Sequence, residues 1–241
     1  MSMNSRFRTA APSIVTAAGM LLGFSSIAVA ASGRVETAAW LIVYCTFLDK
    51  ADGSLARILG VSSRFGMEMD SYSDFTSFGI APAALLWFSL YDTAAVPIWW
   101  VAFASLTWVL MTAVRLARFN VDDCADTDCF SGVPTTLAAG VFASLFLTLE
   151  RAGLVTAWGS SLIPLFLALG ILMVGRLRIP KIKPRKSRAF NLFQYSMILL
   201  ALAIAVARVL PEALLALSSG YLVIGGLVGN RTPSSIDDEA G

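Results

Sequence analysis

The sequence predicts an all-α fold, a polytopic integral membrane helical bundle of about eight transmembrane helices with both termini in the cytoplasm. Three observations predict it: the composition, a series of long apolar stretches, and the distribution of basic residues between those stretches. Of the 241 residues, 57% are hydrophobic and 14% are charged, and the mean hydropathy is +0.73. A soluble domain carries about 25% charged residues, so this chain cannot cover a globule with polar groups. The composition therefore excludes a soluble single domain.

Each apolar stretch has roughly 17 to 25 residues, enough for a helix to cross about 30 Å of hydrocarbon. The predicted spans cover residues 12–31, 36–56, 69–91, 95–118, 134–150, 156–175, 190–208 and 210–229. The first span also resembles a secretory signal peptide, because Arg6 and Arg8 precede it and residues 28–30 read Ala-Val-Ala. Its apolar run exceeds the usual length of about 7 to 15 residues, and Gly19 and Gly23 suit packing against another helix. We therefore favour a retained span.

The basic residues predict the orientation of the spans. With the N-terminus in the cytoplasm, only Arg34, Arg151 and Arg208 of the 18 basic residues fall in outer loops. The remaining fifteen fall in inner segments, as the positive-inside rule requires. We therefore expect a multi-pass protein of the cell membrane, whose basic residues 176–188 lie near anionic headgroups on the cytoplasmic side.

The chain is predicted to form one membrane domain, residues 1–230, followed by a disordered cytoplasmic tail, residues 231–241, which is rich in Ser and Asp. The net charge of +2 is too small to indicate a nucleic acid partner.

Four aspartates lie at the ends of otherwise apolar helices within residues 48–79. One aspartate at the centre of a membrane helix costs about 2.5 to 3.5 kcal/mol, so we expect the four near the interface or in a hydrated cavity. Helical spacing puts Asp49 and Asp52 on one face, as an i, i+3 pair, and Asp70 and Asp74 on one face, as an i, i+4 pair. Four ionised carboxylates at close range repel unless cations intervene. Two Mg²⁺ or Mn²⁺ ions would balance their charge and suit displacement at phosphorus.

Small and basic residues flank these aspartates. Gly53, Ala56 and Gly66 leave room for a ligand to approach the helices, and Arg57 and Arg64 can offer planar forks to phosphate oxygens. Helix packing and the positive-inside rule are the alternative explanations for these residues. An ion-coupled transporter, or a non-catalytic membrane scaffold, is the alternative for the aspartates. A site at two consecutive helix ends on one membrane face favours chemistry on a lipid over passage across the bilayer.

The segment resembles the signature of the CDP-alcohol phosphatidyltransferases at all eight defining positions, Asp49-x2-Asp52-Gly53-x2-Ala56-Arg57-x8-Gly66-x3-Asp70-x3-Asp74. The resemblance implies a site for two divalent cations that binds a CDP-linked lipid and transfers its phosphatidyl group to an alcohol, releasing CMP. It implies that Asp49, Asp52 and Asp70 are metal ligands and that Asp74 is both a ligand and the general base. It also implies a pocket for the cytidine diphosphate lined by Gly53, Ala56, Arg57 and Gly66.

Four further segments are similar to the phosphatidylserine synthase branch of that family: FGIAPAAL after Asp74, RLARFN ending the fourth span, FSGVPTT before the fifth and GRLRIPKIK after the sixth. The branch often opens its first span with Pro-Asn-x-x-Thr. Here Ser13 replaces the Asn, and Thr16 is kept as a predicted contact of the CDP-lipid. Thr135 and Thr136 stand where Ser-Pro is more familiar.

Arg118 and Asn120 end the fourth span where it meets the cytoplasm, and are the candidate contacts of the acceptor alcohol. Snorkelling and helix capping are the alternative roles for this pair.

The branch resemblance implies a cytoplasm-facing enzyme that converts CDP-diacylglycerol and L-serine to phosphatidylserine and CMP with two divalent cations, Mg²⁺ or Mn²⁺. The closest alternative keeps this chemistry and changes the acceptor to glycerol phosphate, inositol or choline. The family resemblance also implies a homodimer.

Overall fold

A computed structural model describes residues 3–60, 63–93, 96–121, 129–180 and 188–229. As predicted, these residues are almost all helical. The elements in chain order are α1 (Met3–Ala31), α2 (Val35–Leu59), α3 (Arg64–Asp74), the π-helix η1 (Phe75–Ile80), α4 (Ala81–Leu90), α5 (Ile98–Val121), β1 (Cys129–Ser131), α6 (Thr135–Arg151), α7 (Gly159–Val174), β2 (Arg178–Pro180), α8 (Arg188–Ala207) and α9 (Pro211–Gly229). The tail predicted to be disordered, residues 231–241, lies outside the described residues.

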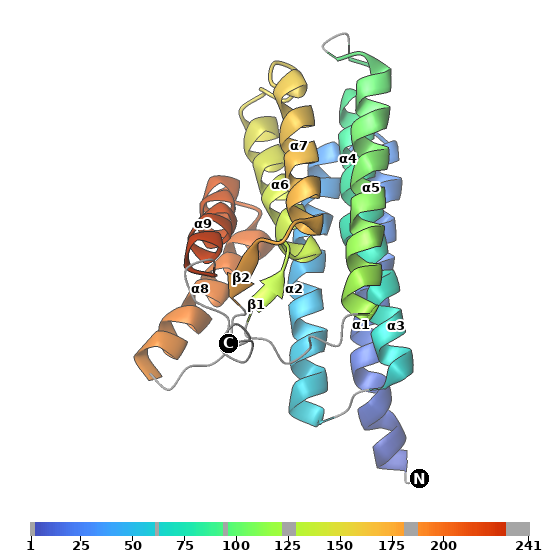
Figure 1. Ribbon diagram of the computed structural model, residues 1–241, viewed down its shortest axis with the longest axis vertical. Helices are drawn as coiled ribbons and strands as arrows, with labels where there is room; N and C mark the ends of the chain where they lie inside the picture. The colour runs from blue at the N-terminus through green and yellow to red at the C-terminus, as the bar shows by residue number, and fades with distance from the viewer. Residues whose placement is uncertain (1–2, 61–62, 94–95, 122–128, 181–187, 230–241) are drawn as a thin grey trace, which may run out of the picture.

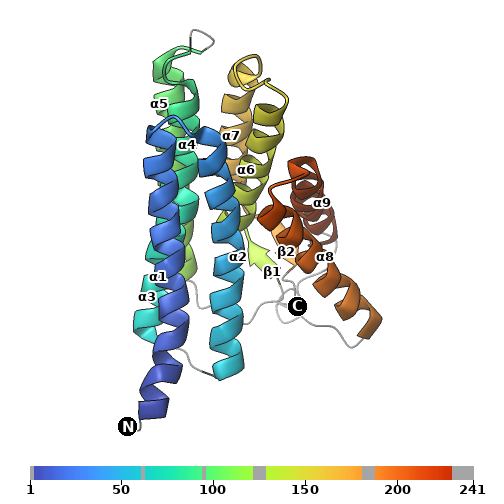
Figure 2. The same cartoon turned by 180° about the vertical axis from the view of Figure 1, so that it is seen from behind.

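Helices α1 to α7 run side by side in one elongated bundle, in which α3, η1 and α4 follow one another in a single column (Figure 1). Helices α8 and α9 lie against one side of this bundle and contact α2 and α6 (Figures 1 and 2). In the turn between them, the Arg208 guanidinium donates a hydrogen bond from Nε to the Tyr44 hydroxyl of α2, at 3.1 Å. The α8–α9 turn, predicted as an outer loop, therefore lies beside the middle of α2.

Pro82 accounts for the π-helical segment that follows Asp74. In an α-helix the Phe78 carbonyl would accept from the N–H of residue 82, which proline lacks. The indole of Trp108 on α5 donates to this carbonyl instead, at 2.9 Å. The widened turn continues into α4 through a bond from the Ala81 N–H to the Thr76 carbonyl. A proline and a buried tryptophan thus fix the helix column just beyond its last aspartate.

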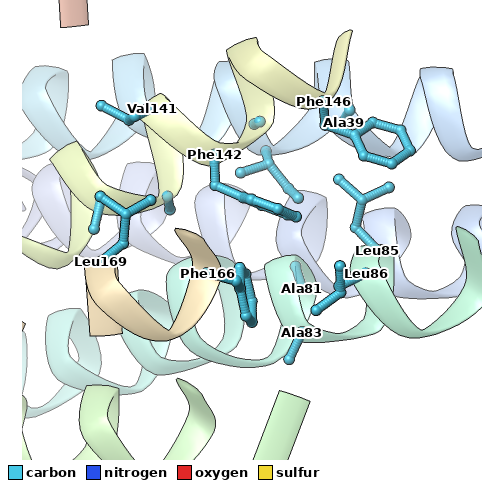
Figure 3. Packing of buried hydrophobic residues seen from close by; sticks show 14 of the residues in the cluster. Ala39, Ala81, Ala83, Leu85, Leu86, Val141, Phe142, Phe146, Phe166 and Leu169 are labelled. Atoms are coloured by element: carbon cyan, nitrogen blue, oxygen red, sulfur yellow. The ribbon is translucent and has the colours of Figure 1, made fainter. Parts of the chain in front are cut away.

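The core of the bundle is aromatic. Phe142 of α6 and Phe166 of α7 meet edge to face with ring centroids 4.5 Å apart, next to Leu85 and Leu86 of α4 (Figure 3). Trp108 stacks on Phe166 with centroids 4.1 Å apart. Because lipid tails are as apolar as these side chains, the bundle gains from close packing rather than from exclusion of water.

A two-stranded antiparallel ladder is the feature that the all-α prediction did not include. Strand β1 pairs with β2, with Ser131 opposite Arg178 and Cys129 opposite Pro180. It joins two segments singled out in the sequence, FSGVPTT and GRLRIPKIK, at the ends of α6 and α7 (Figure 1). Gly132 then turns the chain at a φ of +78°, and a Cβ there would overlap the Met173 carbonyl oxygen. The ladder therefore requires glycine at this position.

Three helices of the described residues are long and apolar enough to cross a membrane, at Ala11–Ala31, Ile98–Val121 and Pro211–Val228. Shorter apolar helices cover Gly159–Val174 and Ser196–Ala207. A membrane protein is thus supported, while the count of eight spans and the cytoplasmic termini stay predictions. The first span is built into the bundle, because α1 packs along α2 and also contacts α3, η1 and α4.

Candidate active site

Three of the signature aspartates converge between α2 and the column formed by α3 and η1. Carboxylate oxygens of Asp49, Asp70 and Asp74 all lie within 4.8 Å of one another, and Asp70 is the exposed member. Asp49 comes from α2, whereas Asp70 and Asp74 lie one helical turn apart on α3. The structure thus brings together three of the four predicted metal ligands.

Asp52, the fourth predicted ligand, is 6% exposed and has its oxygens engaged by the protein. Its Oδ2 accepts from the Thr16 hydroxyl of α1 at 2.8 Å, and its Oδ1 accepts from the Gly53 backbone N–H at 2.6 Å. Among the described residues it is therefore not in the three-carboxylate group, but one turn further along α2. This hydrogen bond brings α1 against the part of α2 that carries Asp52.

Small residues hold α1 close enough for this contact. The hydroxyls of Ser73 and Ser77 donate to the carbonyls of Thr16 and Gly19, each at 3.2 Å. At Gly23 a Cβ would overlap Ser77, so only glycine permits this approach of α1 to η1. The Gly19 and Gly23 pair predicted for helix packing therefore packs within the chain.

A cavity of about 140 Å³ opens between α1, α2 and α3 beside the aspartates. Its lining contains the predicted residues Thr16, Asp52, Gly53, Ala56, Gly66 and Asp70, together with Pro12, Ser13, Ser63 and Met67. Ser63 caps the N-terminus of α3 by accepting from the Gly66 N–H at 3.0 Å. This end of α3 presents backbone N–H groups and the positive end of a helix dipole, which suit a phosphate.

The two predicted phosphate-binding arginines are exposed and do not line the cavity. Arg57 folds back along α2, with its Nε donating to the Gly53 carbonyl at 3.0 Å. Arg64 begins α3, one residue after the Ser63 cap. Both stand on helix ends next to cavity residues.

The two candidate acceptor residues are engaged elsewhere. Arg118 is exposed and donates to the Val174 carbonyl and the Ser131 hydroxyl, at 3.4 and 3.3 Å, where β1 meets the end of α7. Asn120 hydrogen-bonds to Ser71 of α3 through its amide nitrogen, at 2.9 Å. These contacts join α5 to α7, β1 and α3. They are tertiary contacts, which differ from the capping and snorkelling roles considered above.

Two further residues lie close to Asp74 and are not among the predicted site residues. Arg115 of α5 is 9% exposed, and its Nη1 donates to the Thr135 hydroxyl at 3.4 Å. That hydroxyl donates in turn to Asp74 Oδ2 at 3.5 Å. Arg115 continues the buried face of α5 that carries Trp108 and Thr112, but the almost entirely apolar sequence of this helix does not show which face is buried.

The donor set fits a hard divalent cation. Three carboxylate groups converge, which is the oxygen-only chemistry that Mg²⁺ and Mn²⁺ prefer. Without cations, these three acidic groups would repel one another at the observed separation. Asp49, Asp70 and Asp74 are therefore the residues suited to hold such an ion, with Asp52 one helical turn away.

Comparison with known proteins agrees with this geometry. The CDP-alcohol phosphatidyltransferase family profile matches residues 9–217. A CDP-diacylglycerol–serine O-phosphatidyltransferase of Helicobacter pylori is 33% identical over 217 residues, 89% of this chain and 88% of the relative. An archaetidylserine synthase of Methanothermobacter thermautotrophicus is 30% identical over 175 residues, 72% of this chain and 70% of the relative. A Bacillus subtilis relative with the same name as the first is 28% identical over 187 residues, 75% of this chain and 94% of its own. The chain therefore belongs to the CDP-alcohol phosphatidyltransferase family.

Proposed function

We propose that this chain transfers the phosphatidyl group of CDP-diacylglycerol to L-serine and releases phosphatidylserine and CMP. One observation carries the chemistry: three signature aspartates converge beside a cavity lined by other residues of the same signature. The acceptor rests on the relatives, since the three described above are named for serine.

In this proposal the cavity holds the CDP end of the lipid. A Cβ at Gly53 would meet nothing within 4 Å, so glycine there leaves open volume for the ligand. Thr16 keeps the Asp52 carboxylate in the cavity wall, and the N-terminus of α3 faces the phosphates. Arg57 and Arg64 reach the diphosphate from the adjoining helix ends, with Arg57 exchanging its bond to its own helix for phosphate oxygens.

Asp49, Asp52, Asp70 and Asp74 are the proposed ligands of two Mg²⁺ or Mn²⁺ ions. Ions held by these residues would supply electrostatic stabilisation of the diphosphate and of the charge on the leaving CMP. Asp74 takes the proton of the serine hydroxyl as that oxygen attacks phosphorus. The half-buried position of Asp74 at the end of α3 keeps this proton transfer away from bulk solvent.

The proposed setting is the cell membrane, crossed eight times, with both termini and the active site on the cytoplasmic side. The fifteen basic residues of the inner segments support this orientation. The domain covers residues 1–230, membrane lipids surround it, and a second copy of the chain completes a homodimer.

An acceptor panel tests the function. Purified protein, CDP-diacylglycerol and Mn²⁺ or Mg²⁺ are incubated with radiolabelled serine, glycerol phosphate, inositol or choline, and the lipid products are separated. We expect labelled phosphatidylserine, loss of activity with a chelator, and recovery when the metal is restored. A labelled lipid from another alcohol, with serine inert, would replace the acceptor and keep the chemistry. Absence of metal-dependent release of CMP with any acceptor would instead favour the ion-coupled transporter.

A further inference from the structure

Arg115 and Thr135 form a buried polar chain that ends on Asp74. Thr135 is 1% exposed, at the first position of α6, and its hydroxyl oxygen lies 3.4 Å from Arg115 Nη1 and 3.5 Å from Asp74 Oδ2. A hydroxyl has one proton to donate and two lone pairs. It can therefore accept from the guanidinium and donate to the carboxylate at the same time, as the two contacts require.

Packing alone does not explain an arginine at this place. Arg115 lies on the buried face of α5, and its Nε has no hydrogen-bond partner among the described residues. Its guanidinium carbon also lies 6.0 Å from the centroid of the Phe119 ring. A buried charge with an unsatisfied N–H costs stability, and an apolar side chain would fill the space without that cost. The neighbouring negative charges of Asp74 and Asp49 stabilise the positive guanidinium at this buried position.

Thr135 also differs from an ordinary helix-start residue. The position before it is Pro134, which makes no side-chain capping bond, and the Thr135 hydroxyl is directed to two side chains of other elements. It connects α5, α6 and the end of α3 at one oxygen atom.

We propose that Arg115, acting through the Thr135 hydroxyl, is a positioning residue for Asp74. The pair holds Oδ2 of this carboxylate and so fixes the orientation of Asp74 in the cluster formed with Asp49 and Asp70. The inference rests on the proposed function for its kinetic part only, because the orientation of Asp74 also governs how tightly the cluster binds a cation. Partners that orient a ligating carboxylate typically contribute about 10- to 100-fold in metal affinity or activity.

The test compares Thr135→Val, Thr135→Ser and the matched control Thr136→Val in detergent-purified full-length protein. Valine keeps the shape of threonine and removes the hydroxyl, serine keeps the hydroxyl, and Thr136 is the half-buried neighbour on the same turn. Binding of Mn²⁺ to metal-free protein is measured by electron paramagnetic resonance, without substrate. Turnover and KM are then measured with CDP-diacylglycerol and serine.

We expect Thr135→Val to weaken Mn²⁺ binding and lower kcat, each about tenfold or more, with KM for CDP-diacylglycerol changed less than about threefold. Thr135→Ser and Thr136→Val should stay within about threefold of the parent in both measurements. Arg115→Met should give the same losses, and Arg115→Met combined with Thr135→Val should cost no more than the larger single change, as expected for residues acting in series.

Parent-like Mn²⁺ binding by folded Thr135→Val would overturn the inference, as would equal losses in Thr135→Val and Thr136→Val. If Arg115→Met does not fold, the comparison of Thr135→Val with Thr135→Ser decides whether the inference holds. Because Mn²⁺ binding is measured without substrate, the inference can survive or fail whether or not serine proves to be the acceptor.

Discussion

The signature aspartates are not equivalent in the folded chain. Asp52 is buried, with one oxygen held by Thr16 and the other by the Gly53 N–H. Asp70 is exposed at the mouth of the same region. A carboxylate already fixed by two donors has little conformational freedom left to lose, whereas an exposed one must be ordered by the ligand. Asp52 therefore forms the fixed wall of the cavity and Asp70 its adaptable side.

Asp74→Asn tests the role of the proposed base. The amide is nearly isosteric but cannot take a proton, so turnover should fall by about two to four orders of magnitude. CDP-lipid binding should be largely kept, with a moderate loss because Asp74 is also a proposed metal ligand. The measurements are steady-state kinetics and equilibrium binding of radiolabelled CDP-diacylglycerol. The control is Asp92→Asn, because Asp92 is an exposed aspartate that follows the end of α4, away from the cluster. Unchanged turnover in well-expressed Asp74→Asn would leave this residue a purely structural role.

At the residue scale, helical spacing predicts most of the site. The i, i+4 interval places Asp70 and Asp74 together on α3, and Asp49 joins them from α2, whereas its i, i+3 neighbour Asp52 lies outside this group. Helical spacing could not show that Arg115, rather than the predicted Arg118, lies close to Asp74. Which of the two faces the interior depends on how α5 is rotated, and β1, which gives Arg118 its partner Ser131, is not visible in the apolar pattern.

At the scale of elements, α1 braces the two helices that carry the aspartates. It contacts α2 through Thr16 and Asp52, and it contacts the α3–η1 column where Ser73 and Ser77 donate to its carbonyls. These hydroxyls satisfy polar groups between helices without long side chains, which keeps the backbones close. The separation of α2 from α3, and hence of Asp49 from Asp70, depends on this close contact.

Gly23→Ala should therefore disturb the site from a distance. The added Cβ overlaps Ser77, including its backbone, so α1 must move away from η1. Overpacking of this kind costs about 1 to 3 kcal/mol, and each kcal/mol lowers Tm by about 2 to 4 °C in a chain of this size. The measurement is thermal unfolding of the detergent-solubilised protein, together with KM for CDP-diacylglycerol, which should rise. Gly220→Ala in α9 meets nothing within 4 Å and should leave both values unchanged. Equal Tm values for the two variants would show that the close approach of α1 to η1 does not contribute to the stability of the protein.

The helices could be predicted because most are long apolar stretches, and the boundaries differ from the prediction mainly at the first spans, which extend further toward the end of the bundle where α1 begins. The β1–β2 ladder could not, since its strands have three residues each and pair segments far apart in the sequence. The π-helical turn has a local cause in Pro82, yet its geometry needs Trp108 from another helix. Tertiary contacts thus decide the features that a local pattern leaves open.

At the scale of the whole molecule, the charged residues divide between its two ends. Arg57, near the end of α2, and Arg64, which begins α3, lie toward the end of the bundle where α1 begins, whereas Arg34 and Arg151 lie at the opposite helix ends (Figure 1). Arg208 is an intermediate case. Tyr44, its partner, lies nine residues into α2, or about 14 Å along the helix. The α8–α9 turn therefore lies well short of the beginning of α2, so the predicted orientation rests mainly on the charges of α1 to α7.

Cysteine labelling tests that orientation directly. In a chain whose three native cysteines are replaced by alanine, Arg176→Cys, after α7, should react with a membrane-impermeant maleimide only when cells are opened. Ser32→Cys, between α1 and α2, should react in intact cells, because the positive-inside rule puts the basic segments in the cytoplasm. Both positions are exposed, so a missing signal would reflect the membrane barrier rather than burial. Retained phosphatidyltransferase activity of the cysteine-free chain is the control for folding. Labelling of Arg176→Cys from outside would reverse the orientation, and it would place the aspartate cluster on the face away from the cytoplasm.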